Sequence, residues 1–424
     1  MQRFIVFLLL ATLILAGCSP ASPGTSEPGN TATQALSPTT GSGGPMATDT
    51  PVVTDVPAAT EPTSQTEEPA QPTEATAPQE NQGWIAYTGA GGNIWMLDTA
   101  SGENQQITRD AAPFQPGQPA PEKQISYCCA RWSSDGSLLA YRRDAGTAIE
   151  SGYQYVIELW VYALESQESR MLVQAENIPG FAWKPMSHLI SYALPIPTEY
   201  FMNRSQQPQL ATGLWAVEAN TGDTYQLVAP ERGFALVNPQ WSPDGRFLSF
   251  DEVTAMEGRG DFAYYDFEKQ EYQSWKEAIG QYDWSPSSAT IAYDGLTYTA
   301  IGGERIWLRN RQSGEKRALS PDYQPGYAFR PVFSPQGDQL AYLARLGGPE
   351  TEPVTLFVIG VQGGEPRNLG VFQQTYELVW SPDGNHLALS SGPYEDPQVV
   401  EINVVDGTST VLAEGREPSW RTTE

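Results

Sequence analysis

The pentapeptide Trp380-Ser381-Pro382-Asp383-Gly384 decides the fold, because the chain repeats it. The same five residues occur at 241–245, and four of the five occur at 132–136. In such a turn Pro presets φ, Asp can bond its own backbone and Gly adopts the left-handed conformation. We therefore interpret the repeated Asp as a turn-capping residue rather than as a ligand or an acid. Degenerate copies of the motif lie at Trp183, Trp284, Phe333 and Trp420.

Each aromatic anchor except the last is followed by polar residues and then by a short apolar run, such as Phe247-Leu248-Ser249-Phe250. This order predicts a strand, a tight turn and a second strand. Successive anchors are 40 to 58 residues apart, a spacing typical of propellers and solenoids. Short strands with turn signals, and the lack of a long helical periodicity, favour the propeller.

The repeats predict a closed ring. Near the start, the stretches at 84–87, 93–98 and 105–108 match only the second, third and fourth strands of a repeat, and the missing first strand is found at 417–420. Pairing of these two ends would remove an open sheet edge. We therefore predict an all-β fold, a seven-bladed β-propeller of four-stranded blades closed by the C-terminal strand as a terminal latch. The six complete units are expected at 129–173, 180–228, 239–275, 282–319, 331–369 and 378–412.

The repeats resemble those of a known family. They read W-S-P-D-G, then an apolar strand ending in Tyr or Phe, then Ile/Leu-Trp/Phe-Val and a Gly turn, as in TolB-like, WD-repeat-like (PD40-type) propellers and the propellers of prolyl-oligopeptidase-like peptidases. The resemblance covers Gly83 to Trp420 and implies the fold, but little about function. TolB-like proteins carry an α/β domain where this chain has a Pro/Thr-rich stretch, so a Tol-Pal role is not expected. No hydrolase domain is expected either, since four residues follow Trp420.

The first residues predict export and a lipid anchor. Arg3 precedes an apolar run from Phe4 to Leu15, which is typical of a secretory signal and too short for a good membrane span. The following Leu15-Ala16-Gly17-Cys18 resembles the lipobox of bacterial lipoproteins. The resemblance implies that Cys18 is diacylated and becomes the new amino terminus. We expect an extracytoplasmic protein, at the cell surface or in the periplasm, tethered to the bacterial membrane through Cys18.

The stretch that follows Cys18 predicts a linker. Residues 19–82 are rich in Pro, Thr, Ala, Ser and Glu and contain no Lys or Arg. Such a segment cannot bury enough apolar surface to offset the entropy of ordering, so we expect disorder. The predicted organisation is a signal peptide at 1–17, a lipid-anchored disordered linker at 18–82 and the propeller at 83–424.

The charge and the scarcity of histidine exclude several functions. A formal charge of -26 argues against nucleic-acid partners and against electrostatic docking to anionic lipids. The only histidines are His188 and His386, and no G-x-S-x-G motif occurs, so neither a Ser-His-Asp triad nor a Cys/His metal site is expected. We expect a protein that is not an enzyme and needs no cofactor. Whether the acidic loops bind a calcium ion is left undecided by the sequence.

The adjacent Cys128 and Cys129 have two interpretations. Neighbours in a regular strand point to opposite faces, and in an oxidising compartment they could still form a strained vicinal disulfide with a redox or ligand-sensing role. The alternative is one buried thiol and one thiol facing the channel or solvent. The strain expected for a vicinal disulfide favours the pair of thiols.

Long insertions predict a binding face. They occupy 109–124, 195–212, 253–261 and 345–353, all on the side opposite the W-S-P-D-G turns, and repeat proteins often bind there. Aromatic and Arg side chains in these loops are candidate contacts, although they could instead pack on the rim. The leading function is a non-catalytic binding or scaffolding module for protein, peptide or glycan. The alternatives are a propeller enzyme of lyase or glycosidase type at the central channel mouth, and a structural spacer. The candidate rim residues are Phe114, Tyr200, Phe201, Met202 and Arg204.

Overall fold

The computed structural model describes eleven stretches of the chain. By contacts the chain divides into two units, Met1–Thr73 and Glu74–Glu424, and every described residue belongs to the second unit. The predicted signal peptide and linker therefore lie outside the described residues. The described ranges are 83–113, 121–150, 152–195, 212–230, 234–254, 260–295, 305–323, 325–347, 353–375, 377–393 and 395–422.

The described part of the chain is all-β, as predicted, and no helix within it is long and apolar enough to cross a bilayer. Its strands form antiparallel sheets in which neighbours in space are mostly neighbours in sequence. One sheet of seven strands has the order β23 (Leu378–Trp380), β24 (His386–Ser391), β25 (Gln398–Asn403), β26 (Ser409–Trp420), β1 (Trp84–Gly89), β2 (Ile94–Asp98) and β3 (Asn104–Gln106). Another has the order β12 (Phe234–Trp241), β13 (Phe247–Thr254), β14 (Gly260–Asp266), β15 (Glu271–Trp284), β16 (Thr290–Gly295), β17 (Ile306–Asn310) and β18 (Lys316–Ala318).

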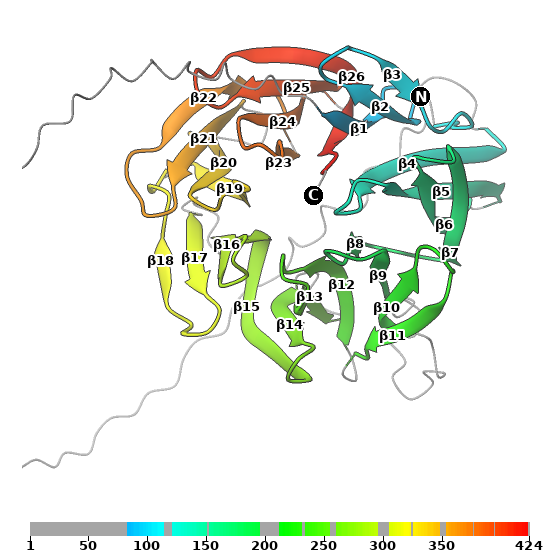
Figure 1. Ribbon diagram of the computed structural model, residues 1–424, viewed down its shortest axis with the longest axis horizontal. Coiled ribbons are helices and arrows are strands. Elements are labelled where there is room, and N and C mark those ends of the chain that lie inside the picture. The colour runs from blue at the N-terminus through cyan, green and yellow to red at the C-terminus, as the bar shows by residue number, and fades with distance from the viewer. Residues whose placement is uncertain are drawn as a thin grey trace, which may run out of the picture. The chain divides into compact units, whose positions relative to one another are not determined.

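Three further sheets contain four strands each. The first contains β4 (Lys123–Trp132), β5 (Leu138–Ile149), β6 (Gly152–Ala163) and β7 (Glu168–Ala175). The second contains β8 (Phe181–Trp183), β9 (Leu189–Leu194), β10 (Gly213–Glu218) and β11 (Thr224–Val228), and the third β19 (Tyr327–Phe333), β20 (Gln339–Arg345), β21 (Val354–Gly360) and β22 (Arg367–Phe372). In Figure 1 the sheets follow one another around a ring, and the first and last strands lie side by side.

Two long strands join four-stranded units into the larger sheets. The first half of β26 pairs with β25, from Ile402↔Ser409 onward, and its second half pairs with β1, up to Ile85↔Trp420. Strand β15 likewise pairs with β14 through its first half and with β16 through its second. The segment that ends at Trp420 therefore lies beside the strand that begins at Trp84.

The repeated turns are built as the sequence predicted. In the turn after Trp380, the Oδ1 atom of Asp383 accepts the Ser381 hydroxyl at 2.5 Å and the Asn385 N–H at 3.0 Å. The Ser381 hydroxyl in turn accepts the His386 N–H at 2.9 Å. The turns at 132–136 and 241–245 repeat these bonds. The repeated Asp therefore caps a turn, and the interpretation is confirmed.

Five anchor tryptophans are buried, so that their indole N–H groups need acceptors: those at 132, 241, 284, 380 and 420. Trp241 and Trp284 donate to the hydroxyls of Ser191 and Ser249, at 3.0 and 2.9 Å. These serines occupy the same position in the second strand of the preceding unit. At that position Ala86 packs with Trp132, whose indole N–H has no partner among the described residues. The same holds for Ala388 and Trp420.

Candidate functional site

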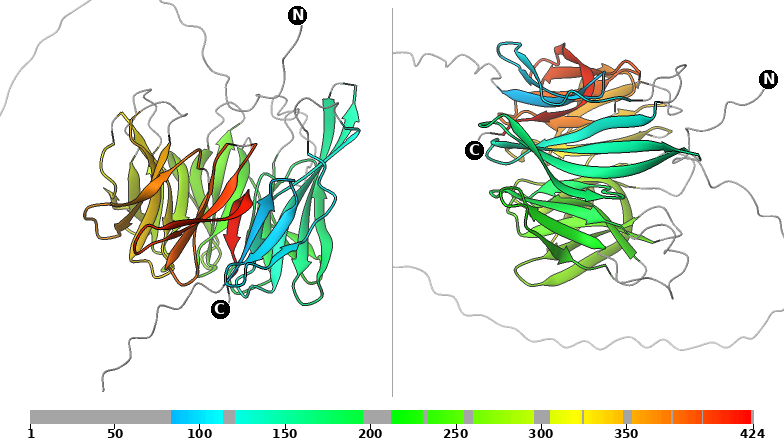
Figure 2. Two further views of the ribbon diagram at one scale, coloured as in Figure 1. Left: turned by 90° about the horizontal axis from the view of Figure 1, so that it is seen from above. Right: turned by 90° about the vertical axis from the view of Figure 1, so that its right-hand side faces the viewer.

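The predicted contact residues Phe114, Tyr200, Phe201, Met202 and Arg204 lie outside the described residues, as does Cys18. What the structure does describe on the predicted binding face is the hairpin formed by β5 and β6. Each strand has 12 residues, and they pair without interruption from Leu138↔Ala163 to Ile149↔Gly152. The second and third strands of the other units have five to eight residues. The β5–β6 hairpin therefore rises beyond its neighbours (Figure 2, left view, cyan to green).

The outer part of this hairpin presents apolar and aromatic groups on a rigid support. The side chains of Ile149 and Tyr155 are 49% and 38% exposed. The Tyr155 ring lies over Gly146, where an added Cβ would come within 2.8 Å of the ring. Its hydroxyl donates to Gln124 Oε1 at 2.5 Å, and the hydroxyl of Tyr153 donates to a main-chain carbonyl of the preceding segment. Anchored aromatic rings lose little conformational entropy when a partner binds.

The first strand of each unit lies toward the middle of the ring in Figure 1, and several of these strands contain a β-bulge three residues before the anchor. A bulge takes a backbone N–H out of the ladder, and that group needs another acceptor. Carboxylates supply it. Asp294 accepts the N–H groups of Gln281 and Arg330, which lie in two of these bulges, at 3.0 and 3.2 Å. Asp283 accepts the N–H of the anchor residue Phe333, beyond the bulge, at 2.8 Å.

Burial perturbs the inner charged groups. It raises the pKa of Asp251 to about 6, opposed by a hydrogen bond from Asn238. Burial also raises the pKa of Asp283 to about 6, opposed mainly by backbone hydrogen bonds. It lowers the pKa of the Arg330 guanidinium. Perturbed groups of this kind occur at functional sites and in structural networks alike. Here the bonds of Asp283 and Asp294 to main-chain amides place both carboxylates in the structural network.

His188 lies beside Asp135 at the turn that follows Trp132. Its Nε2 atom is 2.9 Å from Asp135 Oδ2 and 3.3 Å from the hydroxyl of Ser137, while its Nδ1 atom faces the amide of Asn220 at 2.9 Å. A catalytic triad needs the serine and the aspartate on opposite ring nitrogens. Both are on Nε2 here, so this cluster does not form a triad. It borders a pocket of about 390 Å³ that also contacts Met186 and Glu218.

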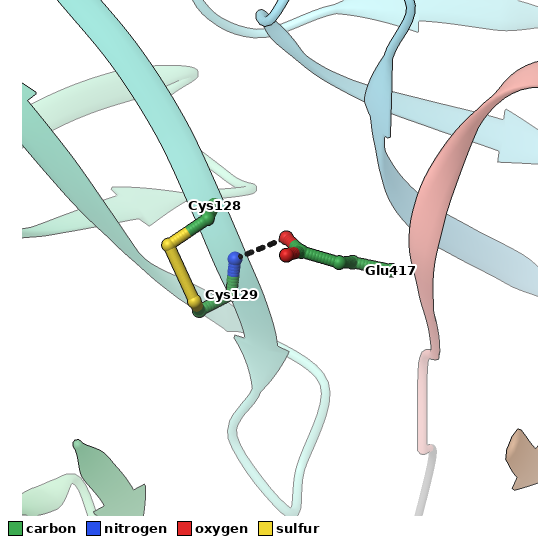
Figure 3. Close-up of side chains that lie close together, drawn as sticks. All are labelled: Cys128, Cys129 and Glu417. Atoms are coloured by element: carbon green, nitrogen blue, oxygen red, sulfur yellow. Dashed lines mark hydrogen bonds between the residues drawn. A yellow bond between two sulfur atoms is a disulfide. The ribbon is translucent and has the colours of Figure 1, made fainter. Parts of the chain in front are cut away.

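Cys128 and Cys129 form a disulfide (Figure 3). The favoured interpretation of two separate thiols is therefore wrong. The bulge between Cys128 and Arg131 explains why, because it breaks the regular alternation of side chains, and Cys129 adopts a φ of 64°. The opposite-face argument holds only for a regular strand.

Glu417 completes this cluster from the other end of the chain. Its Oε2 atom accepts the Cys129 N–H at 2.7 Å (Figure 3). The same atom accepts the Thr88 hydroxyl at 3.1 Å. Ligand atoms of Cys128, Cys129 and Glu417 all lie within 4.8 Å of one another. The sequence analysis missed this group. Alignment of the repeats on their anchors would have indicated this cluster. Cys129 and Glu417 both lie three residues before an anchor, Trp132 and Trp420, in repeats that are neighbours around the ring.

Comparisons with known proteins support the architecture. No family model and no curated protein matches the chain. A prolyl endopeptidase structure is similar with a TM-score of 0.54 and 13% identity, over 80% of this chain and 49% of that chain. An oligogalacturonate lyase in complex with manganese gives a TM-score of 0.51 and 15% identity, over 79% and 86% of the two chains.

TolB from Acinetobacter baumannii is also similar, with a TM-score of 0.47 and 12% identity, over 80% of this chain and 67% of that chain. This chain thus spans about half the length of the endopeptidase but most of the lyase. At such identities the likeness concerns the fold alone. The repeats, the ring of antiparallel sheets and the likeness to the endopeptidase and lyase structures together identify the fold of the chain as a β-propeller.

Proposed function

We propose that this protein is a lipid-anchored extracytoplasmic propeller that acts as a non-catalytic binding module for a protein, peptide or glycan. The ring would contain seven four-stranded blades, with the second half of β26 as the first strand of the blade that β1, β2 and β3 continue. The lipobox-like sequence ending at Cys18 and the linker-like composition of 18–82 support the anchor and the stalk.

The observation that carries the binding function is the β5–β6 hairpin. A propeller needs no 12-residue strands for its own packing, since the other units use shorter ones. The extra length carries the end of the hairpin beyond the neighbouring strands, and this outer part includes the exposed side chains of Ile149 and Tyr155. Exposed aromatic and large apolar side chains on a rigid support are typical anchors of interfaces. A spacer would have no use for them.

The enzymatic alternative requires an acid and a base free to exchange protons with a substrate. Asp294 accepts main-chain N–H groups at two bulges, and Asp283 accepts the main-chain N–H of Phe333. Asp251 has a raised pKa, but its carboxylate accepts a bond from the Asn238 amide at 2.7 Å. The inner carboxylates therefore suit a structural role better than proton transfer, and we favour binding over lyase or glycosidase activity.

Site-specific photo-crosslinking in intact cells tests this function. A photoreactive residue would replace Ile149 in the full chain, and a second variant would carry it at Met186, which is 76% exposed at the turn after Trp183. We expect a defined adduct from position 149 that is absent from position 186. Equal labelling at both positions, or none at 149 in a folded protein, would refute a binding role for the hairpin.

The anchor has its own test. Cys18→Ser should move the protein from the membrane fraction to the soluble fraction, because one acylated cysteine is the expected attachment. A variant with Ser19→Ala serves as the matched control. Retention of the Cys18→Ser protein in the membrane fraction would contradict the proposed anchor.

A further inference from the structure

The group formed by Cys128, Cys129 and Glu417 has the composition of a metal site. Cysteine sulfur and carboxylate oxygen are both ligands of Zn²⁺, and thiolates select thiophilic cations. All three side chains are half-buried, so solvent and ions can reach them without the whole group being exposed. The candidate ligand atoms lie within 4.8 Å of one another, close enough for small side-chain rotations to direct them at one ion.

The disulfide keeps this site closed. The sulfur atoms of Cys128 and Cys129 are bonded to each other, and a cation is bound by thiolates rather than by a disulfide. A dithiol could open the bond by exchange. Two electrons and two protons would pass to the cysteines, and the dithiol would become a disulfide. An incoming cation would then displace both protons from the thiols.

Glu417 is already placed for such a role. Both hydrogen bonds that its carboxylate accepts, from Cys129 N–H and from the Thr88 hydroxyl, go to Oε2. Within the described residues Oε1 has no hydrogen-bond partner, so it can contact a cation without losing either bond. The net charge of -26 favours a cationic ligand.

We propose that Cys128, Cys129 and Glu417 form a redox-gated site for a thiophilic divalent cation such as Zn²⁺, closed by the disulfide and opened by its reduction. Three protein ligands leave one tetrahedral position for water. The site joins β4 to the second half of β26, so a bound ion adds a cross-link where the last strand meets the first sheets. This inference is independent of the proposed binding function.

Cadmium titration tests the site, because Cd²⁺ bound by thiolate has a charge-transfer absorption in the ultraviolet. The full chain would carry Cys18→Ser, which leaves the pair as its only cysteines. One sample stays oxidised, and the other is reduced with a phosphine, which becomes a phosphine oxide and adds no thiol. We expect one Cd²⁺ per reduced chain, a rise in absorption, and at least about tenfold weaker binding by the oxidised chain, since no thiolate is available. Zn²⁺ should displace the Cd²⁺ in competition.

Variants assign the ligands. Cys129→Ser should at least halve the charge-transfer absorption and weaken binding, because Cys128 is then the single thiolate ligand. Glu417→Gln should weaken binding by about tenfold or more, given that even residues behind the ligands change affinity 10–100-fold. Glu414→Gln, an exposed neighbour on β26, is the matched control and should bind as the parent does. Glutamine at 417 keeps a hydrogen-bond acceptor for Cys129, so the fold should persist, as checked by circular dichroism.

Three outcomes would overturn the proposal. Equal Cd²⁺ binding by the oxidised and reduced chains would show that the disulfide does not control binding. No Cd²⁺ binding by the folded, reduced chain would show that the site does not exist. Binding by Glu417→Gln as tight as that of the parent would show that Glu417 is not a ligand. None of these results affects the crosslinking test at Ile149, so failure of the metal site and failure of the binding function are distinguishable.

Discussion

Ser249 on β13 provides a sharp test of how neighbouring units are joined. Its hydroxyl accepts the indole N–H of Trp284 at 2.9 Å and the Tyr282 hydroxyl at 3.1 Å, and it donates to the carbonyl of Gln240 at 2.9 Å. Ser249 itself is fully buried. Ser249→Ala removes one oxygen and deprives two donors of the neighbouring unit of their acceptor.

The size of the effect follows from those two donors. A buried donor left without a partner costs about 1–3 kcal/mol. Trp284 is almost fully buried, whereas Tyr282 is half-buried and can recover part of its loss by bonding water. We therefore expect Ser249→Ala to lower the free energy of unfolding by about 2–4 kcal/mol.

The reverse change should have the opposite sign. Ala388 occupies the equivalent position in β24 and packs with Trp420, whose indole N–H has no partner among the described residues. Ala388 pairs with Val379 as Ser249 pairs with Gln240, so a new hydroxyl would have a carbonyl to bond. We expect Ala388→Ser to raise the free energy of unfolding by about 0.5–1.5 kcal/mol.

Urea denaturation followed by tryptophan fluorescence and by circular dichroism measures both changes. Coincident transitions by the two probes, with similar slopes, are needed before the midpoints are converted to free energies. An unfolding free energy for Ser249→Ala within 0.5 kcal/mol of the parent would refute the reasoning. So would a loss of stability in Ala388→Ser as large as that in Ser249→Ala.

Three further predictions concern charge and backbone. Burial raises the pKa of Asp251 to about 6, so the folded state holds this proton more tightly than the unfolded chain does. The contribution of Asp251 to the free energy of unfolding therefore falls as pH rises from about 4 to 6. Asp251→Asn should remove this loss of stability, so its urea midpoint should lie above that of the parent at pH 7 and equal it at pH 4. The same difference between the two midpoints at both pH values would contradict this. Arg246 forms two bonds to the buried Asp266, at 3.0 and 2.8 Å. Arg246→Ala should therefore lower the urea midpoint, because it leaves that carboxylate without its cationic partner, and a midpoint equal to that of the parent would argue against this. Gly136 and Gly245 share a φ of 66°, but a Cβ at Gly136 would lie 2.1 Å from a main-chain oxygen of the C-terminal segment, whereas at Gly245 the nearest atom is 3.5 Å away. Gly136→Ala should therefore lower the thermal midpoint more than Gly245→Ala does. Equal losses in the two variants would contradict this.

Much of the fold followed from local patterns. The turn after Trp380 was predicted in detail, because its Ser, Asp and Gly act on their own backbone within five residues. The pairing of the stretch at Trp420 with the strand at Trp84 followed from counting strands per repeat. Such predictions succeed because the same local sequence pattern occurs in several copies, so one degenerate copy does not obscure the pattern.

The candidate sites were less accessible to sequence reasoning. The extra length of β5 and β6 was missed, because their continuation beyond Tyr141 and before Glu158 looks like a polar loop in the sequence. The disulfide of Cys128 and Cys129 was rejected on the geometry of a regular strand, and the bulge in β4 removes that premise.

The sequence by itself determined the all-β class, the repeat register and the chemistry of the turns, since these depend on residues a few positions apart. Only the tertiary structure decided which distant side chains meet. Glu417 reaches the amide of Cys129 across 288 residues, and Ser249 meets the indole of Trp284 from a neighbouring unit. The Cys129 amide is available to Glu417 because it lies in the bulge of β4, and a bulge depends on the pairing partner as much as on its own residues. Local rules therefore determine the units, while the packing of neighbouring units against one another determines the sites.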